Sequence, residues 1–217
     1  MPPRDVKIVK KTKAYHGHFH VDVYRFRHRL FRGGWSEIVK REVIDRGSAV
    51  ALTLYDPDRD AVVLIEQFRL PGMLGGGRGW QIEPVAGLLD RAGESEKSVA
   101  RREAIEEAGV QIRGELIPMH RVLASPGALT ELVAHYCARV DSRTTGGIHG
   151  LPGEGEDIRV LVKPLREAMR MVARGRIQNA HCLVALYWLA ANRDRLRQRW
   201  RQPARRKPRL AAKSSRA

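Results

Sequence analysis

The sequence predicts one mixed α+β domain with a basic extension at its C-terminal end. Three observations indicate this: β-branched runs with a period of two in the first half, one alanine-rich helical segment near residue 100, and two helical segments after residue 164. The 217 residues, 43% hydrophobic and 29% charged, suffice for one compact domain of ordinary size.

Strands are predicted where apolar and polar residues alternate or β-branched residues cluster. Phe19 to Phe31 alternates with one change of phase, which indicates a long antiparallel strand with a bulge. The runs 37–44, 48–55 and 61–68 follow as a meander, with the turn Asp56–Asp60 joining the last two. Further strands are expected at 80–85, 116–123, 130–140 and 158–162.

Residues 72–79 contain five glycines, so we expect a mobile loop without helix or strand, either a lid over a substrate or a plain surface loop. Pro164 opens a helix that is expected to reach Arg174. A longer helix is expected at 180–200, with an apolar first half and an arginine-rich second half.

The formal net charge of +16 is concentrated at the C-terminal end. Residues 193–217 hold eleven Lys and Arg against Asp194, a net of +10, which leaves +6 for residues 1–192. We therefore divide the chain into an N-terminal β region (1–47), a catalytic domain (48–192) and a basic, largely disordered tail (193–217).

No run approaches the eighteen or so apolar residues that a membrane helix needs, and no secretory leader is visible, so a cytoplasmic protein without membrane contact is expected. Cys137 and Cys182 each lie in an apolar run, which favours buried free thiols over a disulfide or a metal pair.

The segment 87–110 predicts a helix with defined ends. Gly93 gives a flexible entry, Ser95 can cap the first turn, and Glu96 favours the positive end of the helix dipole. Gly109 suits the left-handed position that follows a helix.

Three carboxylates share one face of this helix, because Glu103, Glu106 and Glu107 stand at i, i+3 and i+4. Like charges so placed repel, which indicates a positive partner there, and hard oxygen ligands select Mg²⁺ or Mn²⁺. A solvated acidic face is the alternative for such a motif alone. The adjoining arc, which would pack on a sheet, is formed by Ala100, Ala104, Ile105 and Ala108.

The whole segment resembles the Nudix box, Gly-x5-Glu-x7-Arg-Glu-U-x-Glu-Glu-x-Gly-U, where U is aliphatic. Residues 102–110 match its second half with Ala104 at the first U, and Glu94 has the required spacing before Arg102. One departure is that six residues, not five, separate Gly87 from Glu94. The chain is therefore identified as a Nudix hydrolase, which implies the Nudix fold: a mixed sheet sandwiched by helices.

The resemblance extends to most of residues 5–200 and is closest to bacterial ADP-ribose pyrophosphatases. It is carried by the runs VDVYRFRHRLF, VVLIEQFR, VAGLLDRAGES, LASPG and GIHGLPGEGEDIRV. Pro126, well past the box, is a marker of that group.

The resemblance implies a role for each matching residue. The metal ligands would be the Ala86 carbonyl, Glu103 and Glu107, with Glu106 assisting. Glu154, on a glycine-flanked loop, would be the general base, and Glu156 would reach a metal once the loop closes; two solvated loop glutamates are the alternative. Arg102 would orient carboxylates rather than touch substrate, with Glu94 supporting it.

Substrate contacts follow from the same resemblance. His18 stands where the family often has an aromatic that stacks on adenine, and Phe19 is an alternative stacker. In the family the N-terminal strands exchange across a homodimer, so Arg41 and Glu42 would serve the partner's site. The remaining contacts would be Arg46, Arg69, Leu88, Ser125, Pro126, Gly127 and Glu131.

The leading hypothesis is therefore a metal-dependent hydrolase that cuts ADP-ribose, or a related nucleoside diphosphate sugar, at its pyrophosphate bond. A nucleic-acid-binding or RNA-processing protein on a Nudix scaffold is the alternative, because the basic tail can neutralise phosphates. That tail has one aromatic residue, Trp200, and no stacking platform, which favours weak nonspecific contact.

Overall fold

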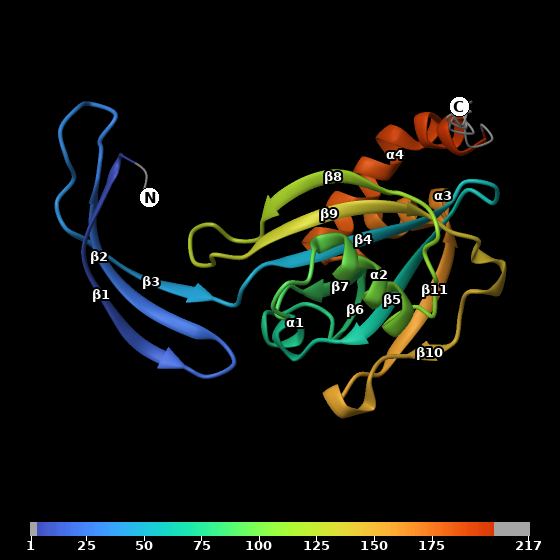
Figure 1. Cartoon of the computed structure of the whole chain (residues 1–217), viewed down its shortest axis with the longest axis horizontal. Helices are drawn as coiled ribbons and strands as arrows, with labels where there is room; N and C mark the ends of the chain where they lie inside the picture. The colour runs from blue at the N-terminus through green and yellow to red at the C-terminus, as the bar shows by residue number, and fades with distance from the viewer. Residues whose placement is uncertain (1–3, 202–217) are drawn as a thin grey trace, which may run out of the picture.

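The computed structural model describes residues 4–201, which form two β-sheets and the helices that cover the larger sheet (Figure 1). The smaller sheet is antiparallel, with strands β1 (Val6–His16), β2 (His20–His28) and β3 (Val39–Asp45) in that order. It stands to one side of the larger sheet in Figure 1. An N-terminal antiparallel region was expected, but β1 itself was not, because its strand VKIVKKTKAYH carries four lysines and is mostly exposed.

The larger sheet is mixed and runs β10-β11-β5-β4-β9-β8, with β6 paired to β5 and β7 paired to β4. The central strand β4 is parallel to β9 and antiparallel to β5, which makes the sheet mixed. The bounds are β4 Ala49–Asp56, β5 Ala61–Phe68, β6 Trp80–Glu83, β7 Val85–Leu88, β8 Leu116–Leu123, β9 Leu132–Arg139, β10 Ile148–His149 and β11 Ile158–Pro164.

Helices cover both faces of this sheet. The helix α2 (Glu96–Glu106) packs on one face through Val99, Ala100 and Ala104, within an apolar core that β4, β5 and β9 complete. The helices α3 (Leu165–Ala173) and α4 (Ala180–Arg201) cover the other face through a second core. The predicted α+β class, a mixed sheet sandwiched by helices, is confirmed.

The glycine-rich segment does hold a helix, contrary to the prediction. The short helix α1 (Leu70–Leu74) includes Gly72, and it forms because Pro71 sits in its first turn. The Gly75 N–H then closes the turn on the Pro71 carbonyl at 2.9 Å. One turn needs only local hydrogen bonds, so glycine content does not prevent it.

The expected meander is interrupted between β3 and β4. Within residues 4–201, β3 pairs along its length with β2 and otherwise forms one isolated bridge, from Ile44 to Leu129, whereas β4 pairs with β5, β7 and β9. Gly47, with a φ of +80°, lies between β3 and β4 and turns the chain from one sheet to the other. The strand expected at 80–85 is likewise two strands, β6 and β7, which pair with different neighbours.

Helix α4 continues past residue 192, where the domain boundary was expected. Leu196 is 1% exposed, Arg193 pairs with Asp60 at 2.8 Å, and Arg199 pairs with Glu115 at 2.6 Å. The packed structure therefore includes the first nine residues of the expected tail. The rest of that tail, 202–217, lies outside the described residues.

Within residues 4–201, no helix combines the length and the apolar character needed to cross a bilayer. Cys137 and Cys182 are both free and buried, as predicted. Burial raises the pKa of Cys137 to about 12 and raises the pKa of Cys182 as well, so neither thiol is primed for chemistry.

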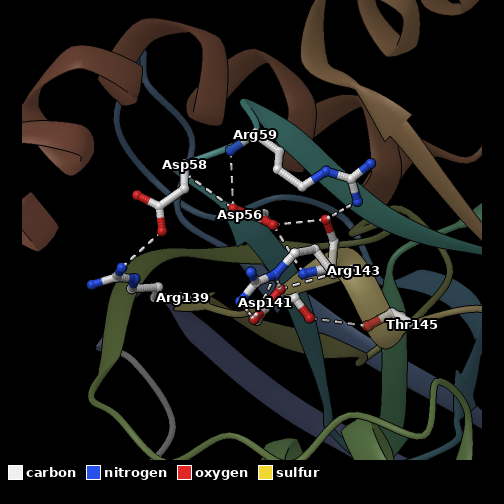
Figure 2. A network of polar contacts seen from close by, with 8 residues as sticks. Asp56, Asp58, Arg59, Arg139, Asp141, Arg143 and Thr145 are labelled. Atoms are coloured by element: carbon white, nitrogen blue, oxygen red, sulfur yellow. Dashed lines mark hydrogen bonds and ion pairs between the residues drawn. The ribbon is translucent and has the colours of Figure 1, made fainter.

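A buried aspartate closes the end of the sheet where β4 stops (Figure 2). The carboxylate of Asp56, 2% exposed, accepts hydrogen bonds from the backbone N–H groups of Asp58, Arg59 and Ser142, and from the Ser142 hydroxyl at 2.7 Å. Burial alone would raise the pKa of Asp56, but these hydrogen bonds outweigh burial and lower it. Asp56 thus ties the β4–β5 turn to the segment after β9.

We predict that Asp56→Ala lowers the free energy of unfolding by about 2–4 kcal/mol, because several buried N–H groups lose a charged acceptor. The stabilisation is present above the usual aspartate pKa and is lost as pH falls through the lowered value, so the difference from wild type should shrink in acid. Urea unfolding at pH 7 measures it. The matched control is Asp58→Ala, which removes an exposed ion pair with Arg139 and should lower the free energy of unfolding by less than about 1 kcal/mol. An equal loss in both variants would contradict the role given to Asp56.

Candidate active site

The helix α2 has the ends that the sequence predicts. The Ser95 hydroxyl accepts a hydrogen bond from the Ser98 N–H at 3.2 Å, and Glu96 lies in the first turn. Gly109, with a φ of +64°, follows the helix, and the ring of His149 fills the space where a side chain at Gly109 would lie. Ile105, expected on the packed arc, is instead 52% exposed, because the sheet contacts only the arc around Ala104.

The acidic face of α2 lies directly against strand β7. The Glu107 carboxylate, in a residue only 3% exposed, accepts a hydrogen bond from the Ala86 N–H at 2.9 Å. The next residue, Gly87, lies so close to Glu103 that a Cβ there would stand 2.0 Å from the Glu103 Oε1. Glycine at position 87 is therefore what lets Glu103 reach the sheet.

Arg102 supplies the positive partner that three acidic side chains on one face require. Its Nη1 contacts the carboxylates of Glu103 at 2.6 Å and Glu106 at 2.8 Å, and its Nε contacts Glu94 at 3.2 Å. One guanidinium thus touches three carboxylates, none of which is more than a quarter exposed. The contacts fix the position of the carboxylates and leave the cluster with a negative excess.

The pKa values of two glutamates in this cluster are raised, chiefly by burial. Burial raises the pKa of Glu103 to about 7, although the Arg102 charge opposes this. Burial also raises the pKa of Glu107 well above its usual range, with Glu103 and Glu156 adding repulsion. Carboxylates that are penalised for ionising fit a site for a divalent cation, which would favour their charged forms.

The cluster is not a preformed cage. Within residues 4–201, no three His, Cys, Asp or Glu side chains adopt a metal-binding arrangement. The donors that face one another are Glu103, Glu107 and the backbone of Ala86. Such a sparse protein donor set suits a cation that takes its other ligands from water and phosphate.

A cavity of about 750 Å³ opens beside β7 and the start of β4. Its size lies within the range of small-molecule sites. Of the residues predicted to touch substrate or metal, it is lined by His18, Phe19, Arg46, Arg69, Ala86, Leu88 and Glu131.

Two ion pairs hold the basic side chains of this cavity. Arg69 donates to Glu83, with the closest contact 2.9 Å, and Arg46 lies 3.3 Å from Glu131. The Arg46 guanidinium also stands over the Phe19 ring at 5.8 Å from its centroid. The cavity therefore presents guanidinium groups and one aromatic face in the same space.

Five predicted contact residues are absent from this cavity. Arg41 and Glu42 lie exposed on β3, where the Arg41 Nη1 donates to the Lys40 carbonyl. Ser125, Pro126 and Gly127 lie exposed in the β8–β9 loop, which is tied to β3 by the Ile44 N–H donating to the Ala128 carbonyl at 2.8 Å. The single chain does not bring these five residues to the cavity.

The loop between β10 and β11 carries the two predicted loop glutamates. Glu154 ends a short 3-10 turn (Pro152–Glu154) and is exposed, and its carboxylate has no hydrogen bond or ion pair within residues 4–201. The Glu156 carboxylate accepts from the Leu151 N–H at 3.0 Å. The Gly150 N–H donates to the Glu106 carbonyl, so the loop begins at the end of α2.

Several polar residues that line the cavity were not predicted from the sequence. Glu83 is buried and also accepts from Gln67 and Asn179, and His181 contacts the buried His135 at 3.1 Å. A buried charge in the β6 run WQIE was the available signal for Glu83. Nothing local marks Asn179 or His181, which reach the cavity only through the packing of α4.

Comparison with known proteins extends these observations. Residues 45–184 match the family model described as NUDIX domain. The chain is 45% identical over 196 residues to the ADP-ribose pyrophosphatase of Escherichia coli (strain K12), covering 90% of this chain and 93% of that protein. It is 38% identical over 152 residues to the GDP-mannose pyrophosphatase of Citrobacter koseri, covering 69% and 77%. A solved structure entitled "Crystal structure of ADP compounds hydrolase" shares the fold, with a TM-score of 0.67, 19% identity and coverage of 92% and 98%.

We predict that a divalent cation stabilises this chain more at pH 8 than at pH 5. Without a cation, the raised pKa of Glu103 gives stability that is present below the usual glutamate pKa and is lost as pH rises through about 7. The measurement is the midpoint of thermal unfolding with and without MgCl₂. This midpoint should rise by about 2–4 °C for each kcal/mol by which cation binding stabilises the folded chain. Glu103→Gln should abolish the stabilisation by the cation. Glu167→Gln, which removes an exposed ion pair with Lys163, should leave that stabilisation unchanged. An equal shift in both variants would place the cation elsewhere.

Proposed function

The chain belongs to the NUDIX domain family, and we propose that it hydrolyses the pyrophosphate bond of nucleoside diphosphate sugars, with ADP-ribose as the leading substrate. ADP-ribose would yield AMP and ribose 5-phosphate, one water being added across the P–O–P bridge. GDP-mannose is the competing substrate, because a relative named for it also matches.

The observation that carries this proposal is the contact of half-buried Glu103 and buried Glu107 with strand β7 beside a cavity lined by guanidinium groups. Acidic groups that fit a cation and basic groups that fit phosphates stand at the same end of the sheet. A purely nucleic-acid-binding protein would not need the acidic half of this arrangement.

The Ala86 carbonyl, Glu103 and Glu107 are the groups that would hold the cation, with Glu106 and Glu156 as auxiliary ligands. Mg²⁺ fits better than other common cations, because it binds through one or two carboxylates and keeps waters and substrate oxygens as further ligands; Mn²⁺ is the alternative. When bound, such a cation lowers the pKa of water and offsets the charge of the pyrophosphate.

The remaining steps fall to the chain's own side chains. Arg69, held by Glu83, and Arg46, held by Glu131, would orient the phosphates, and Phe19 or His18 would pack against the base. Glu154 would accept the proton of the attacking water, since its carboxylate lies on a loop next to the acidic cluster. Arg102 would keep Glu103 and Glu106 in place.

We further propose that the site is completed in a homodimer by exchange of the N-terminal sheets. The support is geometric: Arg41, Glu42 and residues 125–127 lie together at the β3 end, yet outside the cavity of their own chain. Exposed apolar side chains on the small sheet, Ile8, Val9 and Tyr15, are consistent with a partner surface.

The basic end of the chain is proposed to give weak, salt-sensitive contact with nucleic acid. Residues 202–217 contain six Lys and Arg and no acid. Arg193 and Arg199 are already paired with Asp60 and Glu115, so the boundary of this extension is better drawn after Arg201 than after Asn192.

We predict Mg²⁺-dependent hydrolysis of ADP-ribose in a panel with GDP-mannose, NADH and capped RNA, each also run with Mn²⁺. Glu107→Gln, which keeps the size of the side chain, should lower turnover by at least about a hundredfold because a buried ligand loses its charge. The rates are measured by adding a phosphatase that releases inorganic phosphate from the products. Circular dichroism checks that the variant is folded. Faster cleavage of capped RNA than of ADP-ribose would refute the substrate, and full activity of Glu107→Gln would refute the site.

We predict that Glu154→Gln lowers kcat by about 10²- to 10⁴-fold with little change in KM, as expected when a general base is lost. Glu106→Gln is the comparison, since Glu106 is the competing base and already pairs with Arg102. Both variants are assayed at saturating Mg²⁺. The assignment fails if Glu154→Gln retains more than about a third of kcat while Glu106→Gln loses it.

A further inference from the structure

A second cavity, of about 590 Å³, lies apart from the one described above. The two cavities have no lining residue in common. Along β6, Trp80 lines the second cavity and Gln81 and Glu83 line the first, which follows from the alternation of side chains along a strand. The second cavity therefore opens on the opposite face of the sheet from the acidic face of α2.

Three arginines from separate parts of the chain meet in this cavity: Arg78 before β6, Arg159 on β11, and Arg176 between α3 and α4. Arg159 and Arg176 both pair with the carboxylate of Glu66, whose side chain is only 3% exposed. A single buried acid thus holds two guanidinium groups at the cavity wall.

These arginines keep hydrogen-bonding capacity for a ligand. Arg176 uses only its Nη2 on Glu66, at 2.7 Å, and Arg159 uses its Nε and Nη2, within residues 4–201. The Arg78 guanidinium has no ion pair or hydrogen bond in that range, where its backbone N–H donates to the Gln178 side chain and its backbone carbonyl accepts from the Gln81 side chain. With Asp157 also lining the wall, three guanidinium groups face two carboxylates, which leaves a net charge of +1.

The same cavity also offers an aromatic and an aliphatic surface. The Trp80 side chain is exposed (the residue is 47% exposed), and its ring is held edge-on by Phe68 at 5.8 Å between centroids. Ile148, 65% exposed, lines the same cavity. An indole that a neighbouring ring keeps in place, beside unsatisfied guanidinium donors, is the arrangement that binds a planar base attached to an anion.

We propose that this cavity is a binding site for a nucleoside monophosphate, separate from the hydrolytic site. The base would stack on Trp80, and the phosphate would be held by Arg78 and Arg176. Near pH 7 a monophosphate carries about −1.5 to −2, so its excess over the +1 of the cavity is smaller than that of a diphosphate or triphosphate. The cavity volume lies in the range of small-ligand sites.

The position of the site gives it a route to the candidate active site. Ile148 and Asp157 bracket the loop that carries Glu154 and Glu156, and both line the second cavity. A ligand there would therefore contact both ends of that loop. The binding proposal itself does not depend on hydrolytic activity.

Quenching of tryptophan fluorescence by AMP tests the proposal, because Trp80 is the one tryptophan that lines either cavity in the part of the chain described. The full chain is titrated to millimolar AMP without divalent cation, and adenosine, ribose 5-phosphate and inorganic phosphate are titrated in parallel. We expect saturable quenching by AMP that Trp80→Phe removes. Arg78→Ala and Arg78→Gln should raise the Kd about tenfold or more, as for loss of a charged contact.

Two matched controls locate the site. Arg113→Ala removes an exposed arginine that bonds only Gln111, and Arg46→Ala alters the first cavity, so neither should change the Kd by more than about twofold. The proposal is overturned if AMP gives no saturable quenching, or if Arg46→Ala weakens binding and the Arg78 variants do not. It is also overturned if ribose 5-phosphate or phosphate competes as tightly as AMP, since stacking on Trp80 would then contribute nothing.

Discussion

The close approach of helix α2 to strand β7 is the constraint on which the candidate active site depends. Gly87 leaves room for the Glu103 carboxylate, and the Ala86 N–H binds Glu107. Alanine on the packed side of α2, as at Ala100 and Ala104, lets the helix come this near. A larger residue at position 87 would displace Glu103 or the helix. The position of the acidic face therefore depends on the residue at this end of the sheet.

The two ends of β4 have opposite characters because their polar groups are satisfied differently. At one end, Asp56 has its acceptors filled by backbone and hydroxyl donors, and that end is closed. At the other end, Ala49 and Ala51 line the first cavity, and small side chains leave space there. Burial disfavours the charged form of both carboxyl groups, but hydrogen bonds outweigh burial at Asp56 and do not at Glu107, whose pKa is raised.

The sequence predicted those features that local chemistry determines. The ends of α2 follow from Ser95 and Gly109, and β5 and β8 follow from their residue pattern. It did not predict β1, whose charged residues form a strand only because β2 pairs with it, or the contribution of His181, which depends on how α4 packs. Pairing partners and helix placement are tertiary properties, so the shape of both cavities had to come from the structure.

The net charge of the chain does not by itself locate an anion-binding site, because many arginines are neutralised by neighbouring acids. Arg102 already uses four of its five N–H donors on three carboxylates, which leaves one donor for a phosphate, although it stands in the most distinctive motif. Arg69 is matched by Glu83, while Arg159 and Arg176 share one buried Glu66 and Arg78 forms no ion pair within residues 4–201. An anion binds where donors exceed acceptors locally, and that condition holds in the second cavity although the acidic cluster lies on the other face of the same sheet.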